Sequence, residues 1–356
     1  MAFPARDSGR AWSRLAPTAA TLVLTSLTVA VLAGLTSLLG ENYRADPPFF
    51  DPFRAPTRDE AVVVYPAEYA LKSTEYNDVL FLGDSTCRCS VDPAVFQRAS
   101  GLSAYNLGSM GALGMDGYQL ILQIYLRHHP KPRAVVLAVT PDDFDVEVSG
   151  NPGTWAHLFR WSYAPDQEAA LRLPRDVESV KYFAQRGVQI GRACWARPFA
   201  ERGFDPREAF LVGSEKYIYF TLQDKIRQSR GYWALTGKHW VTGTDAPNKP
   251  TVTVAKQWNP GVRELSRVAD ASGILLFIRL VPMVDTVTTD YEPVRNWLHN
   301  LQHDDPGLIV IRPEILLYNP DLCWDYQHLN AAGVEKFSQS LAKDVTSVLS
   351  QRPTQK

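Results

Sequence analysis

Residues 78–85 read Asp-Val-Leu-Phe-Leu-Gly-Asp-Ser, and this stretch decides the fold that we expect for the chain. Four consecutive apolar residues are followed at once by a glycine, where the chain can turn. A short apolar run bounded by a turn is typical of a strand buried on both faces within a parallel sheet. We therefore predict a buried strand here, with Gly83, Asp84 and Ser85 at its carboxyl end.

Strand and helix patterns alternate along most of the remaining chain. Further strands are expected at residues 103–107, 133–140, 273–282 and 307–311. Helical spacing of apolar residues, or a proline suited to a first helical turn, predicts helices at residues 92–99, 117–128, 261–272 and 331–349. This alternation predicts an α/β fold in three layers, with a mainly parallel sheet covered by helices on both faces.

The alternation is lost within residues 144–258, which we interpret as a long helical insert in a domain spanning residues 76–350. Tryptophans are frequent in the insert, among them Trp155, Trp161, Trp195, Trp233 and Trp240. A lid, a substrate platform and simple decoration of the domain all fit this composition. Aromatic side chains are more often part of a core than of a sugar-binding surface.

The composition excludes several classes of protein. The 356 residues carry a net charge of −1, so nothing indicates a nucleic-acid partner. Four cysteines are too few for a disulfide framework, and both buried thiols and a single bridge fit their spacing: Cys87, Cys89, Cys194 and Cys323. Metal-ligand spacings and nucleotide fingerprints are lacking, so we expect neither a metal nor a cofactor.

An uncharged segment at residues 18–39 predicts a transmembrane helix, because its length spans a bilayer core. Three arginines precede it, against a single acidic residue: Arg6, Arg10 and Arg14 against Asp7. This bias places residues 1–17 in the cytoplasm and the rest of the chain outside. Residues 40–75 are interpreted as an extended tether. A cleaved signal peptide and a buried core helix are the alternatives for the apolar segment.

Three stretches supply residues suited to nucleophilic catalysis. Ser85 follows a buried strand, at the edge where open α/β folds place their sites, although an N-cap serine would also explain the local pattern. Residues 106–111 read Asn-Leu-Gly-Ser-Met-Gly after the second strand, and their glycines let backbone approach a substrate closely. Asp325 and His328 precede the last helix, and this spacing can bring a base and its orienting carboxylate together.

Together these stretches resemble the SGNH (GDSL-like) hydrolase superfamily, whose motifs occur in the same order across roughly residues 76–350, the insert excluded. The resemblance implies an SGNH hydrolase-like fold in which Ser85 is the nucleophile. It also makes His328 the general base and then acid, and Asp325 the residue that orients it. The backbone amides of Ser85 and Gly111 would bind the oxyanion. Other residues of the first two motifs would line the site: Asp84, Asn106 and Gly108.

The third motif departs from the family. The family usually has an asparagine in a Gly-x-Asn-Asp stretch, as a side-chain donor to the oxyanion. This chain reads Thr-Pro-Asp-Asp at residues 140–143, so Asp142 takes the place of that asparagine. An ionised carboxylate accepts hydrogen bonds and repels an oxyanion. Either Asp142 is protonated, or it points elsewhere, or this donor is lost; we expect it to line the site.

The motifs and layout look most like the membrane-anchored, alginate O-acetyltransferase-like members of that superfamily, which modify bacterial cell-surface polysaccharide. This likeness implies a serine esterase or O-acyltransferase outside the cytoplasmic membrane, acting on acyl, chiefly acetyl, esters. Its substrate would be an acyl ester or a carbohydrate, and its partner a multi-span membrane acyltransferase. The alternative is a catalytically silent SGNH domain that binds a surface polymer or scaffolds an export complex. Asp142 favours that alternative, whereas the presence of Ser85, Asp325 and His328 argues against it.

Overall fold

A five-stranded parallel sheet organises the protein. The computed structural model describes residues 65–145, 226–235, 258–286 and 291–351, apart from positions 68, 72 and 227. The strand order is β2-β1-β3-β4-β6, and every neighbouring pair is parallel. The strands are β1 (Val79–Leu82), β2 (Ala104–Asn106), β3 (Ala134–Val139), β4 (Leu275–Leu280) and β6 (Leu308–Val310).

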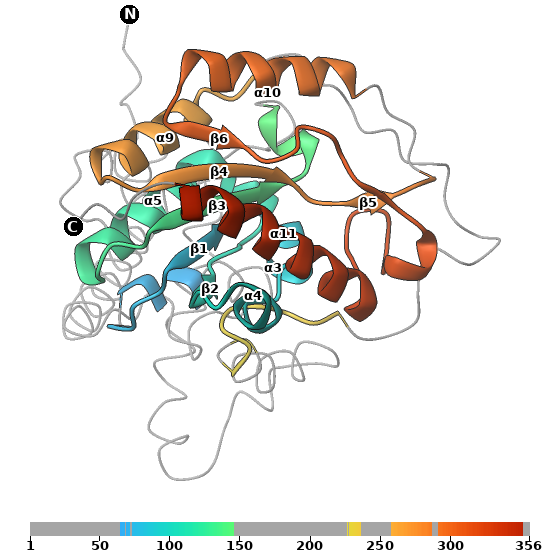
Figure 1. Cartoon of the computed structure of the whole chain (residues 1–356), viewed down its shortest axis with the longest axis horizontal. Helices are drawn as coiled ribbons and strands as arrows, with labels where there is room; N and C mark the ends of the chain where they lie inside the picture. Colours follow the sequence, from blue (N-terminus) through green and yellow to red (C-terminus); the bar gives the residue numbers. More distant parts are fainter. Residues whose placement is uncertain are drawn as a thin grey trace, which may run out of the picture.

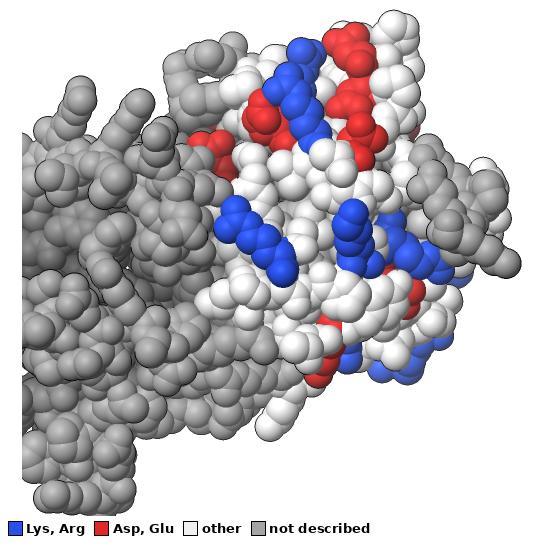
Figure 2. All heavy atoms as spheres, turned by 90° about the vertical axis from the view of Figure 1, so that its left-hand side faces the viewer, with Lys and Arg blue, Asp and Glu red and all other residues white. Residues whose placement is uncertain are grey.

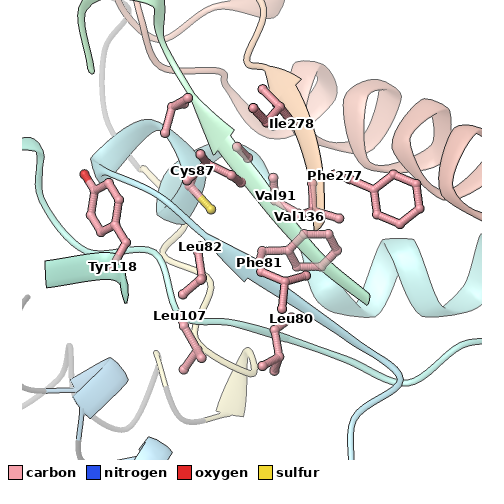
Figure 3. Close-up of a cluster of buried hydrophobic side chains, with 14 of the residues drawn as sticks. Leu80, Phe81, Leu82, Cys87, Val91, Leu107, Tyr118, Val136, Phe277 and Ile278 are labelled. Atoms are coloured by element: carbon pink, nitrogen blue, oxygen red, sulfur yellow. The ribbon is translucent and has the colours of Figure 1, made fainter. Parts of the chain in front are cut away.

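The strands at the centre of the sheet are apolar because both of their faces are covered. All residues of β1 and β3 are buried. Successive side chains point to opposite faces, and Phe81 packs edge-on against Phe96 with ring centroids 5.0 Å apart. Figure 3 shows this core, with labelled side chains from β1, β3 and β4 in one cluster that also includes Cys87 and Tyr118. The apolar run quoted from the sequence is therefore the middle of the hydrophobic core.

Six helices of the described chain cover the sheet. They are α3 (Ser85–Ser90), α4 (Pro93–Ser100), α5 (Gly114–His128), α9 (Gly261–Ala271), α10 (Glu292–Asp304) and α11 (Ala331–Gln351). The chain moves from β1 to β2 in one direction and then through β3 and β4 to β6 in the other. Right-handed crossovers therefore place α3 and α4 on one face, and α5, α9 and α10 on the opposite face. Helix α11 packs against α4 and completes the first of these layers (Figure 1).

The carboxyl edge of the sheet carries short elements rather than long helices. A two-stranded parallel sheet follows β4 and β6, formed by β5 (Met283–Val284) and β7 (Leu317–Tyr318). Three 3-10 turns lie in the loops: η1 (Gly111–Leu113), η2 (Pro141–Phe144) and η5 (Pro320–Leu322). The strand order reverses beside β1, and open α/β sheets place their sites outside the carboxyl ends of strands at such a point. The fold thus brings the loops after β1, β2 and β3 to one edge.

The opposite edge of the sheet, where the strands begin, has a mixed surface. Figure 2 looks onto this side of the molecule, and acidic and basic side chains alternate over the described part of it. One pair links two helices, with Arg263 of α9 3.2 Å from Asp304 of α10. Exposed pairs of this kind contribute little to stability. The described part of this face carries no patch of a single sign.

The predicted α/β fold with a mainly parallel sheet is confirmed, and the strands and helices expected in the described chain are present within a few residues of their predicted ends. The helices α3 and α10 and the strands β5 and β7 were not predicted. Residues 65–67 and 69–71 of the predicted extended tether are helical, because Tyr65, Ala67 and Ala70 are buried in the hydrophobic core. The proposed cytoplasmic segment 1–17, the apolar segment 18–39 and most of the tether 40–75 lie outside the described residues, as does most of the insert 144–258. Within the described chain, no helix is long and apolar enough to span a membrane.

The cysteines are buried thiols wherever the structure describes them. Cys87, Cys89 and Cys323 are each at most 2% exposed, and no disulfide joins any two of the three. Cys194 lies outside the described residues. Burial raises the pKa of Cys87 and of Cys323, which makes both thiols poor nucleophiles at neutral pH.

Candidate active site

Three side chains that are distant in sequence form a continuous hydrogen-bonded chain at the carboxyl edge. The hydroxyl Oγ of Ser85 lies 3.1 Å from Nε2 of His328. The other ring nitrogen of His328, Nδ1, lies 2.8 Å from Oδ2 of Asp325. The side chains of His328 and Asp325 keep only 19% and 15% of their exposure. A hydroxyl, an imidazole and a carboxylate are thus in contact in the order found in the triad of a serine hydrolase.

Ser85 is held at a sharp turn between a strand and a helix. Strand β1 ends at Leu82, and Ser85 is the first residue of α3. Asp84 between them is the N-cap: its carboxylate accepts hydrogen bonds from the amides of Thr86 at 2.9 Å and Cys87 at 3.2 Å. The carboxylate of Asp84 is therefore hydrogen-bonded to the first turn of α3, and the residue is only 6% exposed. The sequence predicted it as a lining residue, whereas the structure buries it beneath the nucleophile.

The turn itself depends on Gly83. Its φ is +149°, and a Cβ there would lie 2.0 Å from the carbonyl oxygen of Ala138 and 2.8 Å from Cβ of Cys87. Strand β3 is therefore packed directly against this backbone, in a conformation that side chains rarely adopt. Only glycine fits at position 83.

We expect Gly83→Ala to lower the free energy of unfolding by several kcal/mol, since the new Cβ meets fixed backbone. Denaturant unfolding of the purified variant measures this. The matched control is Gly101→Ala: Gly101 has φ +73° and nothing within 4 Å of an added Cβ. That control should cost about 1 kcal/mol, from left-handed backbone strain alone. Equal losses for the two variants would mean that the contact with β3 is not what requires glycine.

The loop that carries Asp325 and His328 is braced by its own backbone. Oδ1 of Asp325 accepts from the amides of Gln327 at 2.8 Å and His328 at 2.7 Å, while the carbonyl of His328 accepts from the amide of Trp324 at 2.7 Å. Burial acts to raise the pKa of Asp325, but hydrogen bonds from the ring of His328 and from these amides outweigh it, and the pKa is lowered overall. The carboxylate is therefore ionised and fixed against the imidazole.

The second motif lies along β1 and presents an unpaired amide. The amide of Leu107 donates to Phe81 at 2.8 Å, and that of Ser109 donates to the carbonyl of Gly83 at 2.7 Å. The chain then enters η1 at Gly111. Among the described residues, the amides of Gly111 and Ser85 have no hydrogen-bond acceptor. Both predicted oxyanion donors, the amides at the first positions of α3 and η1, are thus without an acceptor among the described residues.

Asn106 and Gly108 support the site from behind and do not line it. Asn106 is 1% exposed, and its amide group donates to the carbonyls of Cys87 at 3.0 Å and Val91 at 2.8 Å. Its side-chain oxygen accepts from the amide of Gly108 at 2.8 Å. A Cβ on Gly108 would lie 2.7 Å from the amide nitrogen of Arg88. The motif's glycine therefore fits α3 closely, where the sequence had suggested close approach to a substrate.

Asp142 lies in η2, the turn that follows β3, and is linked to the loop of the triad. Its Oδ2 lies 3.4 Å from Nε2 of Gln327, whereas its Oδ1 is buried without a partner among the described residues. Burial and the negative charge of Asp84 raise the pKa of Asp142 to about 6. The neighbouring Asp143 is bonded to Thr140, at 3.1 Å from its amide and 3.2 Å from its hydroxyl.

The raised pKa of Asp142 predicts a pH-dependent stability. The folded-state pKa is about 6 against an ordinary value of 3.8, so between these values the folded protein holds a proton that the unfolded chain has released. Stability from this group is complete below about pH 4 and is lost as the pH rises through 6. We expect Asp142→Asn to melt at a higher temperature than the unaltered protein above pH 6, and the difference to shrink below pH 4. A difference in melting temperature that does not vary with pH would contradict this.

Three further residues at the site carry no recognisable sequence signal. Arg88 and Tyr118 bind the carbonyls of the loop after β2, and Gln327 joins Asp142 to Asp325. In the described part of the chain, no three His, Cys, Asp or Glu side chains are grouped so that they could hold a metal ion.

Comparison with family models, with curated proteins and with solved structures found no match to this chain.

Proposed function

We propose that the protein is a serine esterase or O-acyltransferase that works through an acyl-enzyme on Ser85. The observation that carries this proposal is the hydrogen-bonded chain from Ser85 through His328 to Asp325, at 3.1 Å and 2.8 Å. A structural serine would need neither a histidine nor a buried carboxylate behind that histidine. The unpaired amides of Ser85 and Gly111 add a place for negative charge to develop.

The reaction proceeds in two halves. Oγ of Ser85 attacks the ester carbonyl carbon while Nε2 of His328 takes the hydroxyl proton, and the carbonyl oxygen becomes an oxyanion beside the two amides. The carbonyl re-forms as the C–O bond to the leaving alcohol breaks, and His328 returns the proton to that alcohol. The acyl group is then esterified to Ser85. A second hydroxyl compound, water or a carbohydrate, repeats the steps in reverse and releases free Ser85.

The setting that we propose follows from the N-terminal sequence and from the SGNH-like motifs. Residues 18–39 would anchor the protein in the bacterial cytoplasmic membrane, with the catalytic domain on the outer side. The substrate would then be an acyl, chiefly acetyl, ester or a hydroxyl group of cell-surface polysaccharide, and a multi-span membrane acyltransferase would be the partner that passes the acyl group across the membrane. A domain in this position meets the polymer rather than cytoplasmic metabolites.

The test uses the purified full-length protein with p-nitrophenyl acetate as donor, with and without an oligosaccharide acceptor. We expect release of nitrophenol, and an acid-quenched acetyl-enzyme whose label maps by mass spectrometry to Ser85. Acetylated acceptor would identify a transferase, and acetate alone an esterase. An organophosphorus probe should also label Ser85. A Ser85 that reacts with neither reagent would favour the silent polymer-binding domain, for which the carboxyl group of Asp142 near the triad is the supporting observation.

A further inference from the structure

Arg88 is a buried cation that has no carboxylate partner among the residues that the structure describes. It is 2% exposed, and among the described residues no carboxylate lies within ion-pair distance of it. Its Nε donates to the carbonyl of Gly108 at 3.1 Å, and its Nη2 donates to the carbonyl of Ser109. Burial lowers the pKa of Arg88 to about 10, so the side chain is still charged at neutral pH. Burying a charge costs free energy, and here the hydrogen bonds to two backbone carbonyls offset part of that cost.

Those two carbonyls belong to the loop that leads into Gly111. The next carbonyl, of Met110, accepts from the hydroxyl of Tyr118 at 3.3 Å and from the amide of Leu113 at 3.0 Å. In a trans peptide unit the C=O and the following N–H point in opposite directions. Fixing the carbonyl of Met110 toward the protein therefore turns the amide of Gly111 the other way. Arg88 fixes the two peptide units before it.

The position of Arg88 in the sequence connects this loop to the nucleophile. Arg88 and Ser85 are three residues apart on α3, so they lie on nearly the same side of one short rigid helix. A displacement of α3 moves both together. The planar guanidinium with its several donors can hold two successive carbonyls in a fixed direction, which a lysine ammonium cannot do.

We propose that Arg88 is a positioning residue that holds the amide of Gly111 at the correct distance from Oγ of Ser85, and so sets the rate of acyl transfer. This role rests on the proposed serine chemistry. Oxyanion stabilisation requires donors that are already in place, and small misplacements of a catalytic donor are expensive in rate. Arg88 touches neither substrate nor reacting atoms, and acts only through the backbone of residues 108–111.

The chain offers a matched control in Arg279. This arginine is also fully buried, and it also donates to two backbone carbonyls, those of Arg312 at 3.2 Å and Glu314 at 3.4 Å. Its guanidinium lies over the ring of Phe337, 5.7 Å from the centroid, under helix α11. Substituting Arg279 removes the same kind of structural bond from a loop that carries none of the triad or oxyanion groups.

The experiment compares Arg88→Lys and Arg88→Met with Arg279→Lys and Arg279→Met in the full-length protein. Methionine has a long unbranched side chain but no charge, so at this buried position it should destabilise the fold less than a cation without its hydrogen-bond partners. Turnover of p-nitrophenyl acetate is measured well below each melting temperature and expressed per Ser85 titrated with an organophosphorus probe. For both Arg88 variants we expect kcat to fall about tenfold to a hundredfold, with KM changed by less than about twofold. The Arg279 variants should lower the melting temperature and leave kcat within about twofold.

A second readout does not depend on activity. Amide hydrogen exchange of residues 107–113 should accelerate in the Arg88 variants and stay unchanged in the Arg279 variants, because of the two arginines it is Arg88 that is bonded to that loop. Folded Arg88 variants with unaltered kcat would overturn the positioning role and leave the proposed function standing. Absence of Ser85-dependent turnover in the unaltered protein would overturn both.

Discussion

Replacement of Ser85 with alanine is expected to lower kcat for ester cleavage by about four to six orders of magnitude, the range seen when a triad nucleophile is removed. The reason is that Oγ of Ser85 lies 3.1 Å from Nε2 of His328, and in the described chain no second hydroxyl is bonded to this nitrogen. The hydroxyl of Ser85 is needed for the chemical step and not for binding of the substrate, so KM should change little. Steady-state kinetics with p-nitrophenyl acetate measure both constants.

The control for this prediction is Ser272→Ala. Ser272 ends helix α9, and its hydroxyl donates to the carbonyl of Val268 at 2.8 Å. Loss of that hydroxyl removes a local hydrogen bond without touching the triad, so turnover should be unaltered. Both variants should melt close to the unaltered protein, since Ser85 contributes no bond to the core beyond its contact with His328. Comparable turnover in Ser85→Ala and the unaltered protein would refute the acyl-enzyme mechanism.

The sheet was predictable from the sequence because its strands are buried on both faces. A run such as residues 79–82 must then be apolar throughout, and this pattern is visible without any partner strand. Helix α3 was not predictable in the same way. It has only six residues, too few for a helical pattern of apolar residues to be visible. Its start is defined by the carboxylate of Asp84, and from sequence alone an aspartate that caps a helix cannot be told from one that stabilises a turn.

The residue types of the triad could be named from the sequence, but their contact could not. Ser85 and His328 are 243 residues apart, and only the meeting of the β1 turn with the loop before α11 brings them to 3.1 Å. The glycine-rich second motif is ambiguous in the sequence. A glycine that admits a substrate and a glycine that admits the protein's own backbone look identical in sequence, and Gly108 is of the second kind. Arg88 gave no signal, because a buried arginine is recognised only once its carbonyl partners are located.

Replacement of Asp325 with asparagine is expected to lower kcat by about four orders of magnitude while the fold is retained, because an orienting carboxylate exchanged for its amide leaves a histidine in the wrong tautomer. The side-chain oxygen can still accept from the amides of Gln327 and His328, so the loop keeps its shape. The new NH₂ group then faces Nδ1 of His328 and donates to it. The ring proton is forced onto Nε2, which can no longer accept the proton of Ser85.

A stability measurement separates this effect from loss of structure. The folded-state pKa of Asp325 lies below its ordinary value of 3.8, so the ionised carboxylate stabilises the fold above about pH 4 and that contribution is lost as the pH falls further. The melting temperature of Asp325→Asn should therefore be lower than that of the unaltered protein at neutral pH, and the gap should narrow in acid. Asp321→Asn, an exposed change in η5 of the same loop, is the control and should leave kcat unchanged. If Asp325→Asn kept full kcat, the carboxylate would hold the loop together without directing the proton of His328.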